Sequence, residues 1–343
     1  MTRIALVSPF TLPFPCGNSI LAERLQAGLH KKGGYEVALY DCRTDAAAPA
    51  ARFAPHLLHS INAERPYQWV QEFLQGKKVP WVITLTGTDY NVWCGSGAPP
   101  VPVLESLGRA DALVVFHEDA LQTVRKCLPA VAGKIHIIAQ GVTPAVIVSD
   151  VQRVRQHYGI SPETVLFLMV AGIRPVKNIA VALEAFAEVE KNMASAVLLL
   201  AGPVIDRSEA ERVFSLGSRL QRFRYLGEIA PAAVRELMAA ADVFLNTSLH
   251  EGMSGSVLEA MAAGLPVVAS AVAGNCALVR DNENGLLFSG DDPRELIIAA
   301  VRLSMDRPLR SKLGHAGKKM VAAAYSAEQE IEKYEHLYRS LLK

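Results

Sequence analysis

Residues 250–270 read HEGMSGSVLEAMAAGLPVVAS and closely follow the apolar stretch DVFLNTS at 242–248. The apolar stretch is typical of a buried strand. The residues after it predict a loop, a helix that ends at Gly264 and a second strand, PVVAS. Strand, loop, helix and strand in this order form the repeating unit of a parallel sheet covered by helices. This part of the chain therefore predicts an α/β fold.

The same alternation continues on both sides of that stretch. RIALVSPF at 3–10, VLFLMVAGI at 165–173 and AVLLLAGPV at 196–204 are further strand-like runs with helical segments between them. The rhythm breaks near residue 150. We therefore predict two doubly wound, Rossmann-like domains, residues 1–150 and 151–325, with a final helix over 326–343 that crosses back to the first domain. Ligands of such sheets bind beyond the carboxyl ends of the strands, so we expect a site in a cleft between the domains.

The composition narrows the classes of partner. The chain has 343 residues, 50% of them hydrophobic and 20% charged, with a formal net charge of +1. A net charge near zero gives no electrostatic reason to expect nucleic acid or an anionic membrane. The longest apolar runs reach only about half the length of a membrane span. We therefore expect neither nucleic acid nor a membrane among the partners.

The cysteines are few and far apart. They form no C-x-x-C pair, and an odd number of scattered cysteines is typical of reduced thiols in a cytoplasmic protein. No His, Cys and Asp cluster has the spacing of metal ligands, so we expect no essential metal. The five cysteines are Cys16, Cys42, Cys94, Cys127 and Cys276.

Two glutamates frame the quoted loop and helix. Glu251 lies in the loop after the strand, and Glu259 lies about two helical turns later. Amides at a helix N-terminus bind anions, and a carboxylate can accept two hydrogen bonds from a vicinal diol. One alternative gives Glu259 a structural role only, because Ser256 and Glu259 fit the S-x-x-E capping box.

A pair of cations follows the first strand of the second domain. The segment AGIRPVKN carries Arg174 and Lys177. An Arg can bind a phosphate through two parallel hydrogen bonds, and a Lys supplies a point charge. The alternative is an ordinary solvated loop pair, which the nearby glutamates make less attractive.

At this point the chain resembles a known family. The E-x7-E pattern of Glu251 and Glu259, followed by EAMAAGLPVVAS, AGN and NGLLF, resembles the donor-binding signature of retaining GT-B glycosyltransferases of family 4. SPFTLPFPCGNS resembles the N-terminal glycine loop of that family, and TLTGTD resembles its HGTD-type segment. The GTD, IRPVK and EGMS segments are most similar to the short glycosyltransferase 1 domain-containing subgroup and, more distantly, to the selenosugar synthases.

The resemblance implies a nucleotide-diphosphate-sugar donor of UDP or GDP type, with no cofactor and no metal. It implies that Glu259 holds the ribose hydroxyls and that Glu251 faces the transferred sugar. Glu251, Arg174 and Lys177 would be catalytic. Glu259, Gly252, Met253, Ser254 and Gly17 would bind the donor, and Asn18, Thr88, Asp89 and His59 would lie on the acceptor side.

The chain departs from the family pattern at two places. The Arg usually precedes the Lys by five residues, whereas here the gap is three and Gly172 takes the usual Arg position. Thr86 stands where many relatives carry a histidine beside the reacting sugar, which puts the acceptor in doubt. For the single residue His59, a buried histidine is the competing interpretation.

Three other functions compete with a metal-independent retaining sugar transferase. The first is a nucleotide-sugar-binding GT-B protein with little turnover, which the departures at Thr86 and Arg174 favour mildly. The second is a selenosugar- or thiosugar-type transferase with a small anionic acceptor. The third, a nicotinamide-dependent dehydrogenase, is disfavoured because no G-x-G-x-x-G motif follows the first strand.

Overall fold

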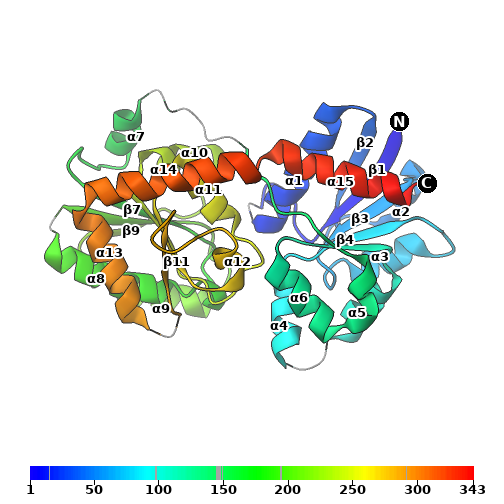
Figure 1. Ribbon diagram of the computed structural model, residues 1–343, viewed down its shortest axis with the longest axis horizontal. Coiled ribbons are helices and arrows are strands. Elements are labelled where there is room, and N and C mark those ends of the chain that lie inside the picture. The colour runs from blue at the N-terminus through cyan, green and yellow to red at the C-terminus, as the bar shows by residue number, and fades with distance from the viewer. Residues whose placement is uncertain (15, 97–98, 144–147, 149, 194, 291) are drawn as a thin grey trace. The chain divides into compact units, whose positions relative to one another are not determined.

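The computed structural model describes residues 1–14, 16–96, 99–143, 148, 150–193, 195–290 and 292–343, and of Thr88, Gly95 and Ser96 the backbone alone. The chain divides into two compact units (Figure 1). Unit 1 comprises residues 1–141 and 327–343, and unit 2 comprises residues 142–326. The boundary that the sequence predicts near residue 150 adjoins residues 144–147 and 149, which lie outside the described residues. The predicted cleft between the two domains stays a prediction.

Unit 1 is built on a parallel six-stranded sheet with the order β2-β1-β3-β4-β5-β6. Strands β3, β4 and β5 are buried along their whole length, as expected of parallel strands covered on both faces. The strands are β1 (Thr2–Ser8), β2 (Tyr35–Asp41), β3 (Leu57–Ile61), β4 (Trp81–Thr84), β5 (Ala112–Val115) and β6 (Ile135–Ile137). The helices are α1 (Gly17–Lys32), α2 (Ala47–Phe53), α3 (Tyr67–Leu74), α4 (Thr88–Ser96), α5 (Val101–Arg109), α6 (Glu118–Cys127), η1 (Pro129–Lys134) and α15 (Ala327–Leu341).

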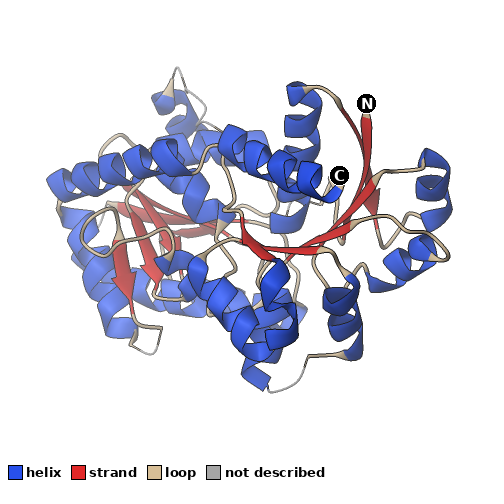
Figure 2. Ribbon diagram, turned by 45° about the vertical axis from the view of Figure 1, so that its right-hand side comes forward, coloured by secondary structure: helices blue, strands red, loops and turns tan. Residues whose placement is uncertain are grey.

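Unit 2 repeats this plan with the order β12-β11-β10-β7-β8-β9. Helices flank the sheet of each unit (Figure 2). The strands are β7 (Val165–Val170), β8 (Ala196–Ala201), β9 (Phe223–Tyr225), β10 (Val243–Asn246), β11 (Val267–Ser270) and β12 (Leu286–Phe288). The helices are α7 (Val151–His157), η2 (Pro175–Lys177), α8 (Ile179–Asn192), α9 (Arg207–Gly217), α10 (Pro231–Ala240), α11 (Gly255–Ala263), α12 (Ala273–Cys276), α13 (Pro293–Met305) and α14 (Arg307–Ala324).

The last helix returns to the unit in which the chain begins. Helix α15 packs against α1, and both belong to unit 1. Arg24 of α1 forms a two-pronged ion pair with Glu330, with nitrogen–oxygen distances of 2.6 and 3.1 Å. Tyr334 and Tyr338 of α15 are fully buried against the sheet. The buried aromatic side chains of this helix are therefore part of the first core.

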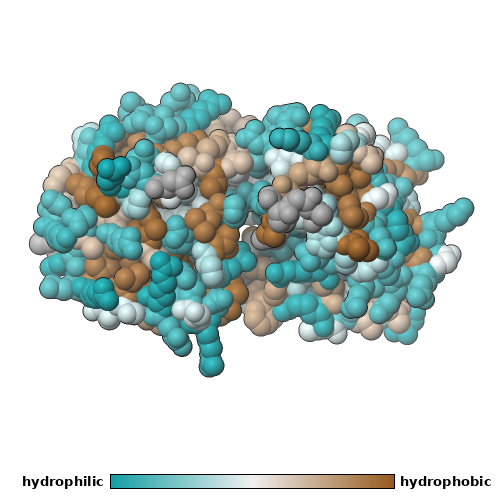
Figure 3. Space-filling view, turned by 90° about the horizontal axis from the view of Figure 1, so that it is seen from below, coloured by the Kyte–Doolittle hydropathy of each residue, from teal (hydrophilic) through white to brown (hydrophobic). Residues whose placement is uncertain are grey.

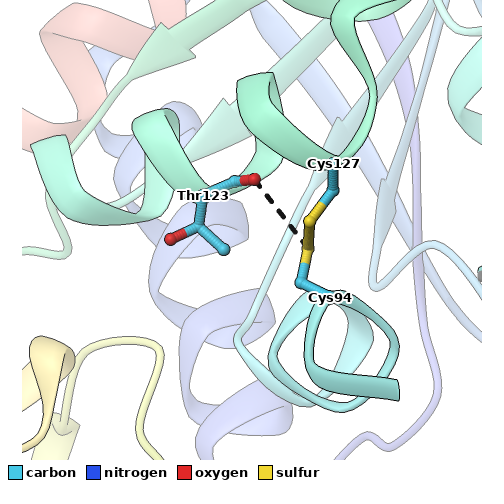
Figure 4. Close-up of a disulfide and its surroundings, with 3 residues drawn as sticks. All are labelled: Cys94, Thr123 and Cys127. Atoms are coloured by element: carbon cyan, nitrogen blue, oxygen red, sulfur yellow. Dashed lines mark hydrogen bonds between the residues drawn. A yellow bond between two sulfur atoms is a disulfide. The ribbon is translucent and has the colours of Figure 1, made fainter. Parts of the chain in front are cut away.

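One cysteine pair contradicts the prediction that all five thiols are reduced. Cys94 of α4 and Cys127 of α6 form a disulfide (Figure 4), and the Thr123 carbonyl oxygen lies 3.9 Å from Cys94 Sγ. The two residues are 33 positions apart in the chain, yet the packing of α4 on α6 brings their Cα atoms to 5.9 Å. Spacing along the sequence could not reveal that approach. Cys16, Cys42 and Cys276 are free thiols.

On the face drawn in Figure 3, hydrophilic and hydrophobic residues are interspersed over both units. None of the helices in the described part of the chain has the length and apolarity that crossing a membrane requires.

Candidate functional site

The order of strands in unit 2 marks where a ligand should bind. After β7 the chain builds β8 and β9 on one side of it, and then β10, β11 and β12 on the other. β7 and β10 are thus neighbours whose following loops run in opposite directions, and ligands of such sheets bind at this switch point. The loop after β7 carries Arg174 and Lys177, and the loop after β10 carries Glu251. The topology therefore brings the two loops that carry the three predicted catalytic residues to the same edge of the sheet.

Lys177 and Glu251 form an ion pair at this point. Lys177 Nζ lies 2.7 Å from Glu251 Oε1, and the two side chains are 17% and 11% exposed. Ser248 Oγ donates to the same carboxylate oxygen at 2.7 Å, and Asn246 Nδ2 donates to it at 3.4 Å. The alternative interpretation of Arg174 and Lys177 is an ordinary solvated pair. Lys177 is instead partly buried, and its ammonium group is paired with the Glu251 carboxylate.

The charge state of Glu251 follows from these neighbours. Burial acts to raise the pKa of its carboxyl group. The charge of Lys177 and the hydrogen bonds from Lys177, Ser248 and Asn246 outweigh that effect, so the pKa lies below its ordinary value. Glu251 is thus a carboxylate at neutral pH.

Arg174 lies at the same edge without an ion pair among the described residues. It caps the short helix η2, and its Nε atom is buried with no hydrogen-bond partner in the described part of the chain. The usual arginine position of the family, Gly172, is filled differently. A Cβ at Gly172 would come within 2.5 Å of Ile205 Cδ1, so an apolar side chain occupies that space. Compared with the family pattern, the arginine lies two positions later in the loop, at Arg174. The usual position, Gly172, packs against Ile205.

Helix α11 begins two residues earlier than the capping-box interpretation requires. Its N-cap is Ser254, whose side chain accepts from the Val257 amide at 3.4 Å. Ser256 is therefore inside the first turn, and the capping box with Glu259 does not form. The predicted end is confirmed, because Gly264 caps the helix with φ of 86°. Glu259 is partly exposed on α11, while Gly252, Met253 and Ser254 are buried in the loop before it.

His59 and Asp89, which we expect on the acceptor side, both lie in the interior of unit 1. His59 is 0% exposed, with Nδ1 2.6 Å from the Tyr338 hydroxyl and Nε2 2.8 Å from Thr84 Oγ1. Asp89 is 1% exposed and accepts hydrogen bonds from the amides of Thr86 and Gly87 at 2.9 and 3.0 Å. Burial raises the pKa of Asp89 to about 6, although the backbone hydrogen bonds act to lower it. Both side chains are buried in unit 1 with their polar atoms bonded within the protein, and their place on the acceptor side stays a prediction.

The remaining unit 1 residues lie at the starts of helices. Gly17 and Asn18 are the first residues of α1, and a Cβ added at Gly17 would meet no atom within 4 Å. Packing therefore does not require glycine there, and a close approach to phosphate stays a prediction. Thr88 begins α4, and its side chain lies outside the described part of the structure.

A pocket opens on the other side of the Glu251 loop. It measures about 540 Å³ and lies beyond the carboxyl ends of β10, β11 and β12. Ser248, Val272, Phe288, Asp281 and Glu295 are among the residues that line it. No group of three His, Cys, Asp or Glu side chains in the described ranges could hold a metal ion.

Sequence reasoning missed the polar residues that surround Glu251. Ser248, Asn246 and Asn275 are each at most 5% exposed, and the first two bond directly to the carboxylate. The sequence contained a signal for two of them. Asn246 and Ser248 come at the end of an apolar strand, and a polar side chain buried there needs a hydrogen-bond partner. Asn275 lies 24 positions after Glu251 and gives no such signal.

Comparisons with known proteins agree with this geometry. Residues 164–306, which include the whole Glu251 site, match the family model "Glycosyl transferases group 1". The chain is 28% identical over 273 residues to glycosyltransferase 1 domain-containing protein 1 from Xenopus tropicalis, which covers 78% of this chain and 79% of that protein.

Solved structures share the fold of the whole chain. Sucrose-phosphate synthase from Thermosynechococcus elongatus superposes with a TM-score of 0.85 at 21% identity and covers 99% of both chains. HepE from Anabaena, solved in complex with UDP and glucose, superposes with a TM-score of 0.83 at 16% identity, over 99% of this chain and 100% of that one. The two six-stranded parallel sheets and their helices are the GT-B arrangement of these structures. The chain is therefore a glycosyltransferase with the GT-B fold, and its second unit contains a glycosyl transferases group 1 domain.

Proposed function

We propose that this glycosyltransferase takes its sugar from a nucleotide-diphosphate-sugar of UDP or GDP type and transfers it, without a metal ion, with retention of configuration. The observation that carries the proposal is the partly buried contact of 2.7 Å between Lys177 Nζ and Glu251 Oε1 at the switch point of the unit 2 sheet. It joins an anion-binding cation to a carboxylate that can face a sugar. The site and the mechanism resemble those of the retaining family 4 enzymes.

Anion binding is supported by three groups that share this edge. Arg174 has a buried Nε with no hydrogen-bond partner among the described residues, Lys177 has two further N–H donors, and α11 directs its N-terminus toward the same loop. A diphosphate would receive bidentate hydrogen bonds from Arg174 and a helix-end interaction from α11. These fixed positive groups supply the charge that a metal supplies in other transferases, which is why we propose metal-independent binding.

The same groups favour the reaction itself. As the bond between the anomeric carbon and the diphosphate oxygen breaks, negative charge grows on that oxygen. Cations and a helix N-terminus stabilise this charge more in the transition state than in the ground state. The acceptor hydroxyl oxygen bonds to the anomeric carbon on the face that the diphosphate leaves, and its proton passes to the departing oxygen. Configuration is retained without a covalent intermediate on the protein.

Glu259 is proposed to hold the nucleoside end. It lies on α11 beyond the loop of Glu251, and the capping role that competed with this function is absent from the structure. HepE, the structural neighbour solved with UDP and glucose, supports a nucleoside diphosphate and a sugar as the ligands of this fold. The acceptor stays open, and a small anionic acceptor is one of the candidates.

The first test measures nucleotide binding in the presence of a chelator. UDP or GDP is expected to raise the melting temperature with EDTA present, because a ligand that binds only the native state stabilises it by mass action. Lys177→Met should abolish most of that shift. The matched control is Lys191→Met, since Lys191 also pairs with a glutamate at 2.6 Å but is 68% exposed on α8. A shift that appears only with added magnesium or manganese would refute the metal-independent proposal.

Turnover separates the roles of the two glutamates. With a nucleotide sugar that the protein hydrolyses slowly, Glu259→Ala should raise KM with little change in kcat, because ribose contacts stabilise ground and transition states alike. Glu251→Gln should lower kcat instead. An unchanged KM in Glu259→Ala would remove Glu259 from the donor site.

A further inference from the structure

Two buried asparagines lie directly behind Glu251. Asn246 ends β10 and is 5% exposed, and Asn275 lies in α12 and is 0% exposed. Asn275 Nδ2 donates to Asn246 Oδ1 at 3.1 Å, and Asn246 Nδ2 donates to Glu251 Oε1 at 3.4 Å. A chain of two amides thus connects α12 to the carboxylate.

Backbone groups fix the orientation of both amides. The Ser248 amide can only donate, and it donates to Asn246 Oδ1 at 3.2 Å, so the Nδ2 atom of Asn246 must face Glu251. The Ser270 carbonyl can only accept, and it lies 3.0 Å from Asn275 Nδ2. The direction of the hydrogen bonds, from Asn275 to Asn246 to Glu251, therefore does not depend on how the two amides were assigned.

Asn246 also connects Glu251 to helix α11. Its Nδ2 atom donates to Ser254 Oγ at 3.1 Å, and Ser254 is the N-cap of that helix. One side chain thus contacts both the carboxylate and the helix start that are proposed to face the sugar and the diphosphate. A shift of Asn246 would move both groups together.

The backbone of α12 supports the same residue from the other side. A Cβ added at Gly274 would lie 2.5 Å from the Glu251 carbonyl oxygen and 2.9 Å from its Cβ. Only a residue without a side chain allows α12 to approach Glu251 this closely. Asn275 and Gly274 are adjacent in α12, so the backbone of this helix and the amide chain hold Glu251 as one unit.

We propose that Asn246 and Asn275 are positioning residues that hold the Glu251 carboxylate toward the transferred sugar; this rests on the proposed function of Glu251. Lys177 alone would not fix the position of the Glu251 carboxylate, because the diphosphate of a donor would compete for its ammonium group. Asn246 is fixed at a strand end by four hydrogen bonds and cannot follow the diphosphate. A misplacement of about 1 Å in such a group can cost about 100-fold in rate.

The test compares Asn246→Asp and Asn275→Ala with Asn284→Ala. Asn284 is a matched control, because it is 4% exposed in the same unit and bonds to the Leu278 carbonyl and the Arg280 amide, away from Glu251. With a hydrolysed nucleotide sugar, the first two variants should lose about 10- to 100-fold in kcat. The affinity of Asn275→Ala for UDP or GDP should stay within about twofold of the wild type, because Asn275 bonds to Asn246 and Ser270 rather than to the helix start at Ser254. Asn284→Ala should change neither quantity.

A second measurement does not depend on turnover. Asn246→Asp places a carboxylate oxygen against Glu251, so it should lower the urea midpoint more in the wild type than in a Glu251→Gln background. Asn284→Ala should lower it equally in both. If Asn246→Asp does not fold, Gly274→Ala takes its place and should again lower kcat but not nucleotide affinity.

The outcomes separate the two proposals. A wild type that binds and hydrolyses no nucleotide sugar refutes the proposed function, while the urea cycle still decides whether Asn246 is coupled to Glu251. Additive effects in that cycle, or a wild-type kcat in both asparagine variants, would overturn the positioning role. An equal loss of kcat in Asn284→Ala would also overturn it, because the effect would then be general destabilisation.

Discussion

His59 and Glu251 are both withdrawn from water, but their surroundings shift their pKa values for different reasons. Burial alone lowers the pKa of His59 to about 3, since no acidic group compensates for the lost hydration of the imidazolium. Burial acts to raise the pKa of Glu251, and the Lys177 charge reverses that effect. Glu251 stays ionised beside its charged partner, as a binding-site residue should. His59 stays neutral, as is usual for a histidine in a hydrophobic core.

The stability of the protein should depend on pH because His59 stays neutral in the folded state. Its folded pKa of about 3 lies below the unfolded value of 6.5, so only the unfolded state gains a proton as the pH falls below 6.5. Stability is then lost progressively, by about 2 kcal/mol at pH 5, because each pKa unit is worth about 1.4 kcal/mol. Urea unfolding at several pH values between 7 and 5 measures this effect. The unfolding free energy should fall more steeply with decreasing pH in the wild type than in His59→Gln. His136→Gln, at an exposed residue, should leave most of the slope. A slope in His59→Gln equal to that of the wild type would contradict the assignment.

At the scale of elements, α15 shows how a C-terminal segment completes the first core. Its aromatic side chains fill the space beside His59, where the Thr84 hydroxyl lies 2.9 Å from the Tyr334 hydroxyl. Its acidic side chains meet basic residues of α1 at two very different depths. The Arg24–Glu330 pair has side chains that are 12% and 1% exposed, whereas those of the Lys31–Glu328 pair are 82% and 61% exposed.

Depth should decide the stability effect of these two pairs. Glu330→Ala leaves the Arg24 guanidinium buried without its carboxylate, which we expect to cost about 3–5 kcal/mol of unfolding free energy. Glu328→Ala should cost less than about 1 kcal/mol, because water screens the exposed pair. Equilibrium urea unfolding of both variants measures the difference. Equal losses would mean that α15 is not held by its buried ion pair.

At the scale of the whole molecule, the described residues of each unit include a hydrophobic core of their own. One cluster of buried residues contains Val7, Trp81 and Leu113 of unit 1, and another contains Phe167, Phe186 and Leu245 of unit 2. Apart from Gly17 of unit 1, the residues that we expect to bind the nucleoside diphosphate come from unit 2. Units with their own cores can unfold separately, so one melting temperature need not describe this protein.

A nucleoside diphosphate should therefore stabilise the units unequally. Hydrogen exchange with and without UDP or GDP is expected to show slower exchange of unit 2 amides around 173–178 and 246–259, with core amides of β1 and β3 unchanged. Scanning calorimetry should show the unit 2 transition moving to higher temperature. Protection confined to unit 1 would place the nucleotide elsewhere.

Particular residues show how far the sequence alone determined this protein. The α/β class, the end of α11 at Gly264 and the loop positions of Arg174, Lys177 and Glu251 follow from local patterns. These patterns depend on hydrophobic periodicity, turn chemistry and the placement of polar residues after apolar strands, all of which act over a few neighbouring positions.

Tertiary structure alone decided the contacts between distant segments. Lys177 meets Glu251 because β7 and β10 are adjacent in the sheet, and Asn275 reaches Asn246 because α12 packs behind the Glu251 loop. His59, which the sequence suggested for a ligand, is enclosed by residues of α15 almost 280 positions later. Side chains so far apart in the chain are brought together only by burial of the apolar faces of whole strands and helices, and no local pattern records that burial.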